Sequence, residues 1–171
     1  MAIVFELVVN FDGNSQGAER AMNMARMHAP LPVGGQRAFE LLEPSIYEAR
    51  GFYVVSIAPA GIGYGVPRDQ GKTRRELTAG ELTELAHGLY RLLAQFDGYR
   101  AATVDWDPEG VVECADLEED YGDQLVEGYP HGLVLAEGVR RGLSADAARH
   151  FEPFSPGFDW IPYRGHQSGT Y

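Results

Sequence analysis

The residues best placed to do chemistry in this sequence are carboxylates that gather in one stretch. Between Arg100 and Arg140 the chain has no Lys or Arg, yet it holds eleven of the 25 acids. These are Asp105, Asp107, Glu109, Glu113, Asp116, Glu118, Glu119, Asp120, Asp123, Glu127 and Glu137. The other 14 acids balance the 14 bases, so the net charge of −11 arises in this stretch. Such a local field attracts cations and basic proteins and repels nucleic acids and anionic lipids.

Residues 105–116 have the oxygen spacing of a calcium-binding loop. Acids stand at its first, third, fifth, ninth and twelfth positions, and Gly110 stands at its sixth. Such a loop follows a helix, however, whereas residues 99–104 have the composition of a strand. Asp107-Pro-Glu-Gly110 also has the residues of a type I hairpin turn. The sequence therefore favours a hairpin here, and no metal or cofactor is expected.

A second segment, residues 59–73, is rich in glycine and in bases that could hold a phosphate. Gly71-Lys72-Thr73 matches the end of a phosphate-binding loop, but Val66 stands where that motif needs its first glycine. The glycines also resemble the Gly-rich turn of acetyltransferases, in which a helix that begins at once helps to hold a pyrophosphate. Here the predicted helix begins only near Thr78. The candidate anion-binding residues are Gly61, Gly63, Gly65, Arg68, Lys72, Arg74 and Arg75.

Nothing in the sequence identifies a catalytic centre. The five histidines have no metal-ligand spacing, and none stands in a pattern that pairs it with a carboxylate. Residues 165–169 resemble a nucleophile elbow but place the serine one position late. The catalytic residues therefore stay unknown, and the sequence favours binding over catalysis.

Hydrophobic spacing predicts the elements that position these groups. Strands are predicted over residues 2–10, 36–42, 51–58, 99–106, 111–115 and 132–136. Helices are predicted over residues 18–29, 78–96 and 144–150, with caps from Asn14 or Ser15, from Thr78 with Glu81, and from Ser144. Residues 116–127 are compatible with either a short helix or a loop.

The order strand, helix, strand, strand, helix, strand over residues 2–106 predicts an α+β fold. It is the split βαβ pattern of a ferredoxin-like sandwich, which has an antiparallel sheet and two main helices. An added hairpin strand and a C-terminal extension would complete it. The 171 residues suit one domain, with a core over residues 2–136 and an aromatic, proline-rich extension over 151–171 that wraps across it.

The location expected from the sequence is cytoplasmic. No apolar run approaches the ~20 residues of a membrane span. The N-terminal stretch has no basic leader and is predicted to be a strand and not a signal peptide. Cys114 is the only cysteine, which agrees with a reducing compartment.

These observations favour an acidic protein-binding module. Its general character resembles that of the immunity proteins that neutralise bacterial nuclease toxins, although no motif carries this resemblance. It implies an inhibitor of a basic protein. The local negative field, for its part, argues against nucleic acids and membranes as partners. The predicted partner-binding residues are Asp105, Asp107, Glu109, Asp116, Glu118, Glu119, Asp120, Tyr121, Asp123 and Glu127. The alternatives are a small acyltransferase-like or nucleotide-binding enzyme that uses residues 59–73, and a non-catalytic assembly subunit. A homo-oligomer is left open.

Overall fold

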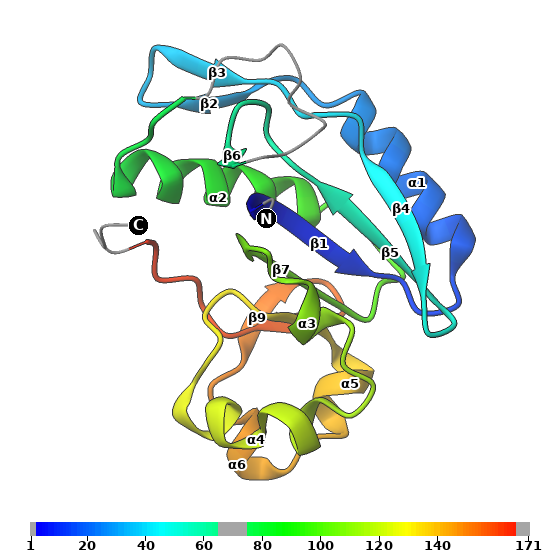
Figure 1. Cartoon of the computed structure of the whole chain (residues 1–171). Helices are drawn as coiled ribbons and strands as arrows, with labels where there is room; N and C mark the ends of the chain where they lie inside the picture. Colours follow the sequence, from blue (N-terminus) through cyan, green and yellow to red (C-terminus); the bar gives the residue numbers. More distant parts are fainter. Residues whose placement is uncertain (1–2, 65–74, 167–171) are drawn as a thin grey trace.

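The computed structural model describes residues 3–64 and 75–166, which form two long helices and several short ones around a curved sheet (Figure 1). The first half of the chain contains β1 (Ile3–Asn10), α1 (Ser15–Arg26), β2 (Leu31–Val33), β3 (Arg37–Phe39), β4 (Ser45–Ala49), β5 (Phe52–Ile57), β6 (Gly63–Tyr64) and α2 (Ala79–Leu93). The second half contains β7 (Ala101–Trp106), α3 (Glu109–Val112), α4 (Leu117–Glu127), β8 (Val134–Ala136), α5 (Glu137–Arg141), α6 (Ala145–Ala148), β9 (Glu152–Ser155) and β10 (Phe158–Trp160).

The main sheet has eight strands, and each of its pairings is antiparallel. Seven strands follow the order β4-β5-β1-β7-β8-β10-β9, and β6 pairs with the beginning of β1. Strands β2 and β3 form a separate hairpin. The expected α+β class is therefore confirmed.

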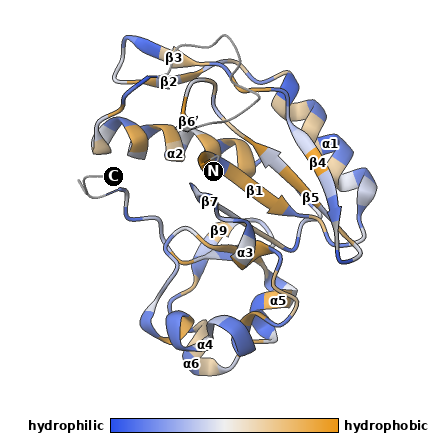
Figure 2. Cartoon of the chain, viewed as in Figure 1, coloured by the Kyte–Doolittle hydropathy of each residue, from blue (hydrophilic) through white to orange (hydrophobic). Residues whose placement is uncertain are grey.

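Side chains that alternate along β1 divide the interior into two cores. Phe5, Leu7 and Val9 belong to the main core, in which the sheet packs against α1 and α2. Val8 points the other way, into a second core that includes buried residues of α3, α4 and α6. Figure 2 shows the hydrophobic character of β1 and β5 between these two layers of helices. The sheet is thus covered by helices on both faces.

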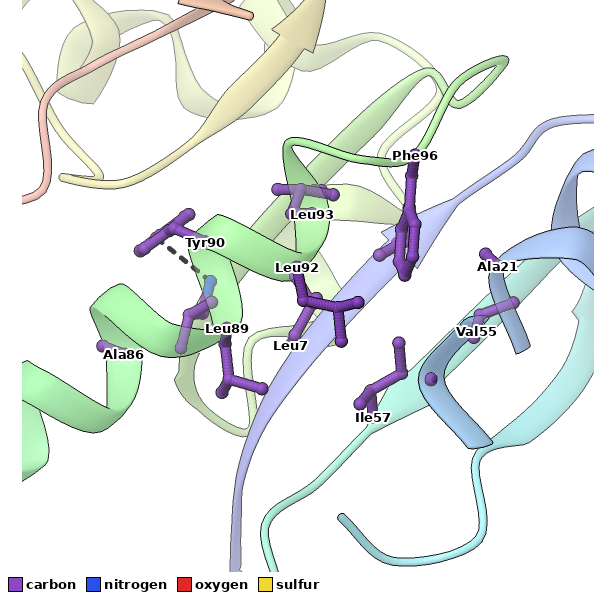
Figure 3. Packing of buried hydrophobic residues seen from close by; sticks show 14 of the residues in the cluster. Leu7, Ala21, Val55, Ile57, Ala86, Leu89, Tyr90, Leu92, Leu93 and Phe96 are labelled. Carbon is purple, nitrogen blue, oxygen red and sulfur yellow. Dashed lines mark hydrogen bonds between the residues drawn. The ribbon is translucent and has the colours of Figure 1, made fainter. Parts of the chain in front are cut away.

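Both long helices begin where their caps were predicted. The Asn14 side chain accepts a hydrogen bond from Gly17 N at the start of α1. Thr78 and Glu81 form the expected capping box at the start of α2. The apolar stripe of α2 then points at the sheet, with Leu89 and Leu92 close to Leu7 (Figure 3). These helices follow from local sequence signals that agree with the tertiary packing.

Tyr90 of α2 closes a gap in the sheet. Strands β7 and β8 pair only at Ala101 and Ala102, and beyond that point they separate. The Tyr90 hydroxyl accepts a hydrogen bond from Val104 N (3.2 Å, Figure 3) and donates one to Gly132 O (2.9 Å). Burial is the main reason why the pKa of Tyr90 lies above its usual value. One side chain therefore satisfies backbone groups of β7 and of the segment before β8.

One predicted strand is confirmed in part and another is wrong. The strand predicted over 36–42 is confirmed at residues 37–39 as β3, which pairs with β2, whereas β5 pairs with β1 and with β4, at residues 45–49. β4 lies at the edge of the sheet, and its Ile46 is exposed. The strand predicted over 111–115 is wrong, because α3 ends at Val112 and residues 113–115 belong to neither a helix nor a strand. Val112 is buried in the second core, and its carbonyl oxygen accepts a hydrogen bond from Asn10 Nδ2. A long-range contact thus replaces the predicted hairpin.

The ferredoxin-like, two-helix description is not confirmed. The described chain has six helices, and β8, β10 and β9 extend the sheet beyond β7. The extension after residue 150 supplies two of these strands. Its aromatic side chains Phe154, Phe158, Trp160 and Tyr163 pack against the main core, as the aromatic content predicted. Among the described residues, no helix has both the length and the apolar character required to cross a membrane.

Candidate functional site

Helix α4 carries the centre of the acidic stretch on the second-core side of the sheet. Asp116 caps the helix by accepting a hydrogen bond from Glu119 N (3.3 Å), and Gly128, with φ of 85°, ends it. Acids in the first turn also interact favourably with the helix dipole. Leu117 and Leu125 are buried and attach α4 to the second core. Residues 117–127 are therefore helical, which settles the alternative that the sequence left open.

The opposite side of α4 presents a row of carboxylates to solvent. Glu119, Asp123 and Glu127 are each four residues apart and all are exposed, and we call them the acidic row. α4 is largely hydrophilic in Figure 2. None of the three forms an ion pair with another residue that the structure describes. Like charges at this spacing destabilise a helix by ~0.2–0.5 kcal/mol per pair, and Glu127 also meets the negative end of the helix dipole.

Several other predicted partner-binding acids have internal hydrogen bonds. Asp107 accepts from Val4 N (2.8 Å), and Glu118 accepts from Ser144 N (2.9 Å). Interaction with the Ser144 side chain, and then with its backbone N–H, holds the pKa of Glu118 below its usual value. Asp105 accepts from Trp106 N (2.8 Å). These carboxylates add to the negative field, but they also stabilise the fold.

The remaining predicted residues lie around α3 and α4. Glu109 is exposed in the first turn of α3. Tyr121 is partly buried and packs against the second core. Its hydroxyl lies close to Gly110 of α3, since a Cβ built at Gly110 would be 3.3 Å from it. Asp116 and Asp120 are exposed beside the acidic row, at the start of the same helix.

A buried carboxylate on β1 was not among the predicted site residues. Glu6 is 4% exposed and accepts a hydrogen bond from the Ser56 hydroxyl. Nearby, the Tyr47 hydroxyl donates to Glu113 Oε1 (2.6 Å). Burial raises the pKa of Tyr47, and the hydrogen bond to Glu113 and the charges of neighbouring acids raise it further. The only sign of this group of polar side chains in the sequence was Glu6, an acid within an apolar strand.

Cys114 lies between α3 and α4 and is 8% exposed. Its sulfur lies 2.9 Å from Asp120 Oδ2 and 3.1 Å from Asp116 O. Burial, and then the hydrogen bond to Asp120, raise the pKa of the thiol to about 11. Because only the thiolate reacts, this environment makes the cysteine inert near neutral pH.

We expect iodoacetamide to label Cys114 at pH 8 roughly a hundredfold more slowly than a small thiol with the ordinary pKa of about 8.5. Mass spectrometry of the intact protein measures this rate. Asp120→Asn removes a carboxylate that raises the pKa, and labelling should become faster. Labelling of the wild-type protein at the rate of the small thiol would contradict this environment.

The Gly-rich segment is only partly described. Gly65, Arg68, Lys72 and Arg74 lie outside the described residues. Gly61 and Gly63, both with positive φ, form the turn into β6. Arg75 donates its backbone N–H to Gly61 O (3.0 Å), and its guanidinium lies over the Phe39 ring, 5.0 Å from the centroid.

The start of α2 is capped by the protein's own side chains. Glu81 accepts from Thr78 N (2.9 Å), and Thr78 Oγ1 accepts from Glu81 N (3.2 Å). The protein's own capping box therefore occupies the helix terminus that a phosphate would use. Within the described ranges, no group of three or more His, Cys, Asp or Glu side chains could hold a metal ion.

Comparisons with protein-family models, with curated proteins and with solved structures find no match for this chain.

Proposed function

We propose that this protein binds a basic protein partner through the acidic row of α4 and acts as an inhibitor or immunity-type protein. The observation that carries this proposal is the row itself, in which Glu119, Asp123 and Glu127 are exposed and lack ion-pair partners among the described residues. A positively charged partner surface bound to this row would offset the repulsion between its three carboxylates, which the free protein leaves uncompensated. The row therefore suits electrostatic recognition better than it suits the stability of α4.

The position of the row favours fast and selective association. Charged residues arranged on one face speed the approach of an oppositely charged protein and disfavour like-charged competitors. α4 is attached to the rest of the protein by Leu117 and Leu125, and Glu118 ties it to Ser144 before α6. A helix held in this way presents its carboxylates with little ordering cost on binding.

The rest of the fold would serve as a scaffold. We propose that β4-β5-β1-β7 with α1 and α2 is a ferredoxin-like core, to which β8, β10, β9 and the small helices are added. A cytoplasmic location would suit the single cysteine, whose thiol is buried. The described part of the Gly-rich segment offers no comparable support for the enzyme alternative.

The test neutralises the row in one variant, Glu119→Gln with Asp123→Asn and Glu127→Gln. The matched control, Glu19→Gln with Glu48→Gln and Glu76→Gln, removes the same charge from exposed positions elsewhere. Partners are first captured from lysate on the tagged wild-type protein, and association rates are then measured with the purified partner. We expect the row variant to lose at least about tenfold in association rate, because steering contributes 10–10³-fold.

Stability provides the second readout. The row variant should have nearly the stability of the wild-type protein. It loses like-charge pairs that destabilise the helix by ~0.2–0.5 kcal/mol each, but it also loses the favourable interaction of the first-turn acid Glu119 with the helix dipole, about 0.3–1 kcal/mol. Urea unfolding measures this difference. If the two variants bind the same proteins at the same rates, the acidic row only keeps the protein soluble and the proposal is wrong.

A further inference from the structure

A cavity of about 220 Å³ lies where the end of α4, the segment after α6 and the segment after β10 meet. It is smaller than the ~300–1,000 Å³ typical of pockets that enclose whole drug-sized ligands. Basic side chains come together here although the chain as a whole is acidic. Arg149, Arg164, His131 and His150 all contribute to its lining.

Arg149 and His150 are held in place by the end of α4. Arg149 Nη2 donates to Val126 O (2.5 Å), and Arg149 Nε lies 3.0 Å from His150 Nε2. His150 Nε2 also lies 3.0 Å from Val126 O, so it either accepts from Arg149 Nε or donates to this carbonyl, according to the tautomer. The other guanidinium nitrogen of Arg149, Nη1, makes no hydrogen bond or ion pair to another described residue. The two side chains therefore retain donors in a preorganised position.

Arg164 and His131 contribute from two other segments. Arg164 is exposed and forms no ion pair with any residue in the described ranges. His131 is partly buried, and its ring lies 4.4 Å from the ring of Tyr129, which is 49% exposed. Burial, and then the charge of Arg164, lower the pKa of His131. The cavity thus combines two uncompensated guanidinium groups with an aromatic wall.

We propose that this cavity binds a small oxyanion group, a phosphate or a carboxylate, held by Arg164 and Arg149 with His131 and His150 beside it. Guanidinium groups form strong, often bidentate hydrogen bonds with such groups. The cavity volume suits one anionic group, so the rest of the ligand would extend past the exposed Tyr129 ring into solvent. Glu127 of the acidic row also lines this cavity. The oxyanion would contact Arg149 and Arg164 and not the row, so this inference does not depend on the function proposed for the row.

Two acids also line the cavity and must be weighed against this proposal. Glu127 and Glu152 are both exposed, and neither forms an ion pair with Arg149 or Arg164. Their charges are therefore solvated, whereas Arg149 is held at the cavity by its bonds to Val126 and His150. The remaining acids act through solvent, and at physiological salt charges more than about 8 Å away are largely screened. The two carboxylates balance the two guanidinium charges along the lining, so anion binding would depend on direct hydrogen bonds from Arg149 and Arg164 and not on the net charge of the cavity.

The pH dependence of binding has a definite sign. The charged and titratable groups that line the cavity with His131 are Glu127, Tyr129, Arg149, His150, Glu152 and Arg164. An anion at Arg164 cancels the positive charge that lowers the pKa of His131, so binding must raise that pKa. By linkage, the anion must then bind more tightly as the pH falls through the titration of His131.

The experiment follows the ring protons of His131 by NMR during titrations with phenyl phosphate and, separately, with benzoate. We expect saturable shifts at His131 and an increase in its pKa with at least one probe. A response to phenyl phosphate alone would assign a phosphoryl ligand, and a response to benzoate alone would assign a carboxylate. No saturable response to either probe overturns the proposal.

Arg164→Gln is the diagnostic variant, because Arg164 is exposed and makes no hydrogen bond to other described residues, so folding should be unaffected. We expect it to weaken binding roughly tenfold to a hundredfold, the cost of a charge-assisted hydrogen bond. Arg91→Gln removes the same charge from the exposed side of α2 and should change affinity less than about twofold. Equal losses in both variants would mean that net charge, and not the cavity, controls binding.

Discussion

Gly132→Ala is expected to destabilise the protein by at least about 3 kcal/mol, from left-handed strain, overpacking and lost hydrogen bonds together. Gly132 has φ of 87°, and a Cβ there would overlap the Tyr90 hydroxyl. Tyr90 cannot easily move away, because it is 3% exposed and its ring packs against those of Trp160 and Tyr163, with ring centroids 5.4 Å apart in each pair. Displacing it would leave Val104 N and Gly132 O without their partner. Urea unfolding measures the loss.

Gly157→Ala is the matched control for this prediction. Gly157 has nearly the same φ, 84°, but no other atom lies within 4 Å of the Cβ position. Alanine there should cost only the conformational strain of about 1–2 kcal/mol. If both variants lose the same free energy of unfolding, backbone strain alone accounts for the loss. Tyr90 then does not hold β7 and the segment before β8 together.

Asn10→Ala is the second change for which we expect a large loss, about 2–5 kcal/mol from two unsatisfied buried groups and the space left behind. Asn10 is fully buried at the end of β1. Its Nδ2 donates to Val112 O (2.6 Å), and its Oδ1 accepts from Asp12 N (2.7 Å). These bonds tie α3 to the central strand and so help to position the acidic segment. Calorimetry or urea unfolding provides the measurement.

Asn23→Ala is the control for Asn10→Ala. Asn23 lies exposed on α1, where its side chain accepts only from Arg26 Nη1 (3.0 Å). Alanine has the higher helix propensity, so this variant should be neutral or more stable by a few tenths of a kcal/mol, roughly. A small effect at Asn10 comparable to that at Asn23 would mean that the link from β1 to α3 contributes little.

The helices that could be predicted best are those whose signals lie within a few residues. Thr78 and Glu81 satisfy each other's backbone groups, and the apolar stripe of α2 repeats at helical spacing whatever it packs against. β1 and β5 were also predictable, because central strands buried on both faces are apolar nearly throughout. The edge strand β4 was missed because it is only five residues long and lies between the breaks at Pro44 and Arg50-Gly51.

The candidate site was predictable only in its composition. The excess of acids between Arg100 and Arg140 follows directly from the sequence. The sequence could not separate the exposed row from Asp107, Glu118 and Asp120, whose partners Val4, Ser144 and Cys114 are supplied by the fold. Nor could it bring Arg164 to Arg149 and His131, because these residues come from three segments.

By itself, the sequence determined the charge of this protein, the α+β class, and the two long helices with their caps. These depend on composition and on interactions between residues at most a few positions apart. The tertiary structure alone decided that α3 replaces a hairpin, that Tyr90 bridges β7 and the segment before β8, and that two arginines share a cavity. Contacts of this kind join residues far apart along the chain, and local patterns do not specify which distant groups will meet.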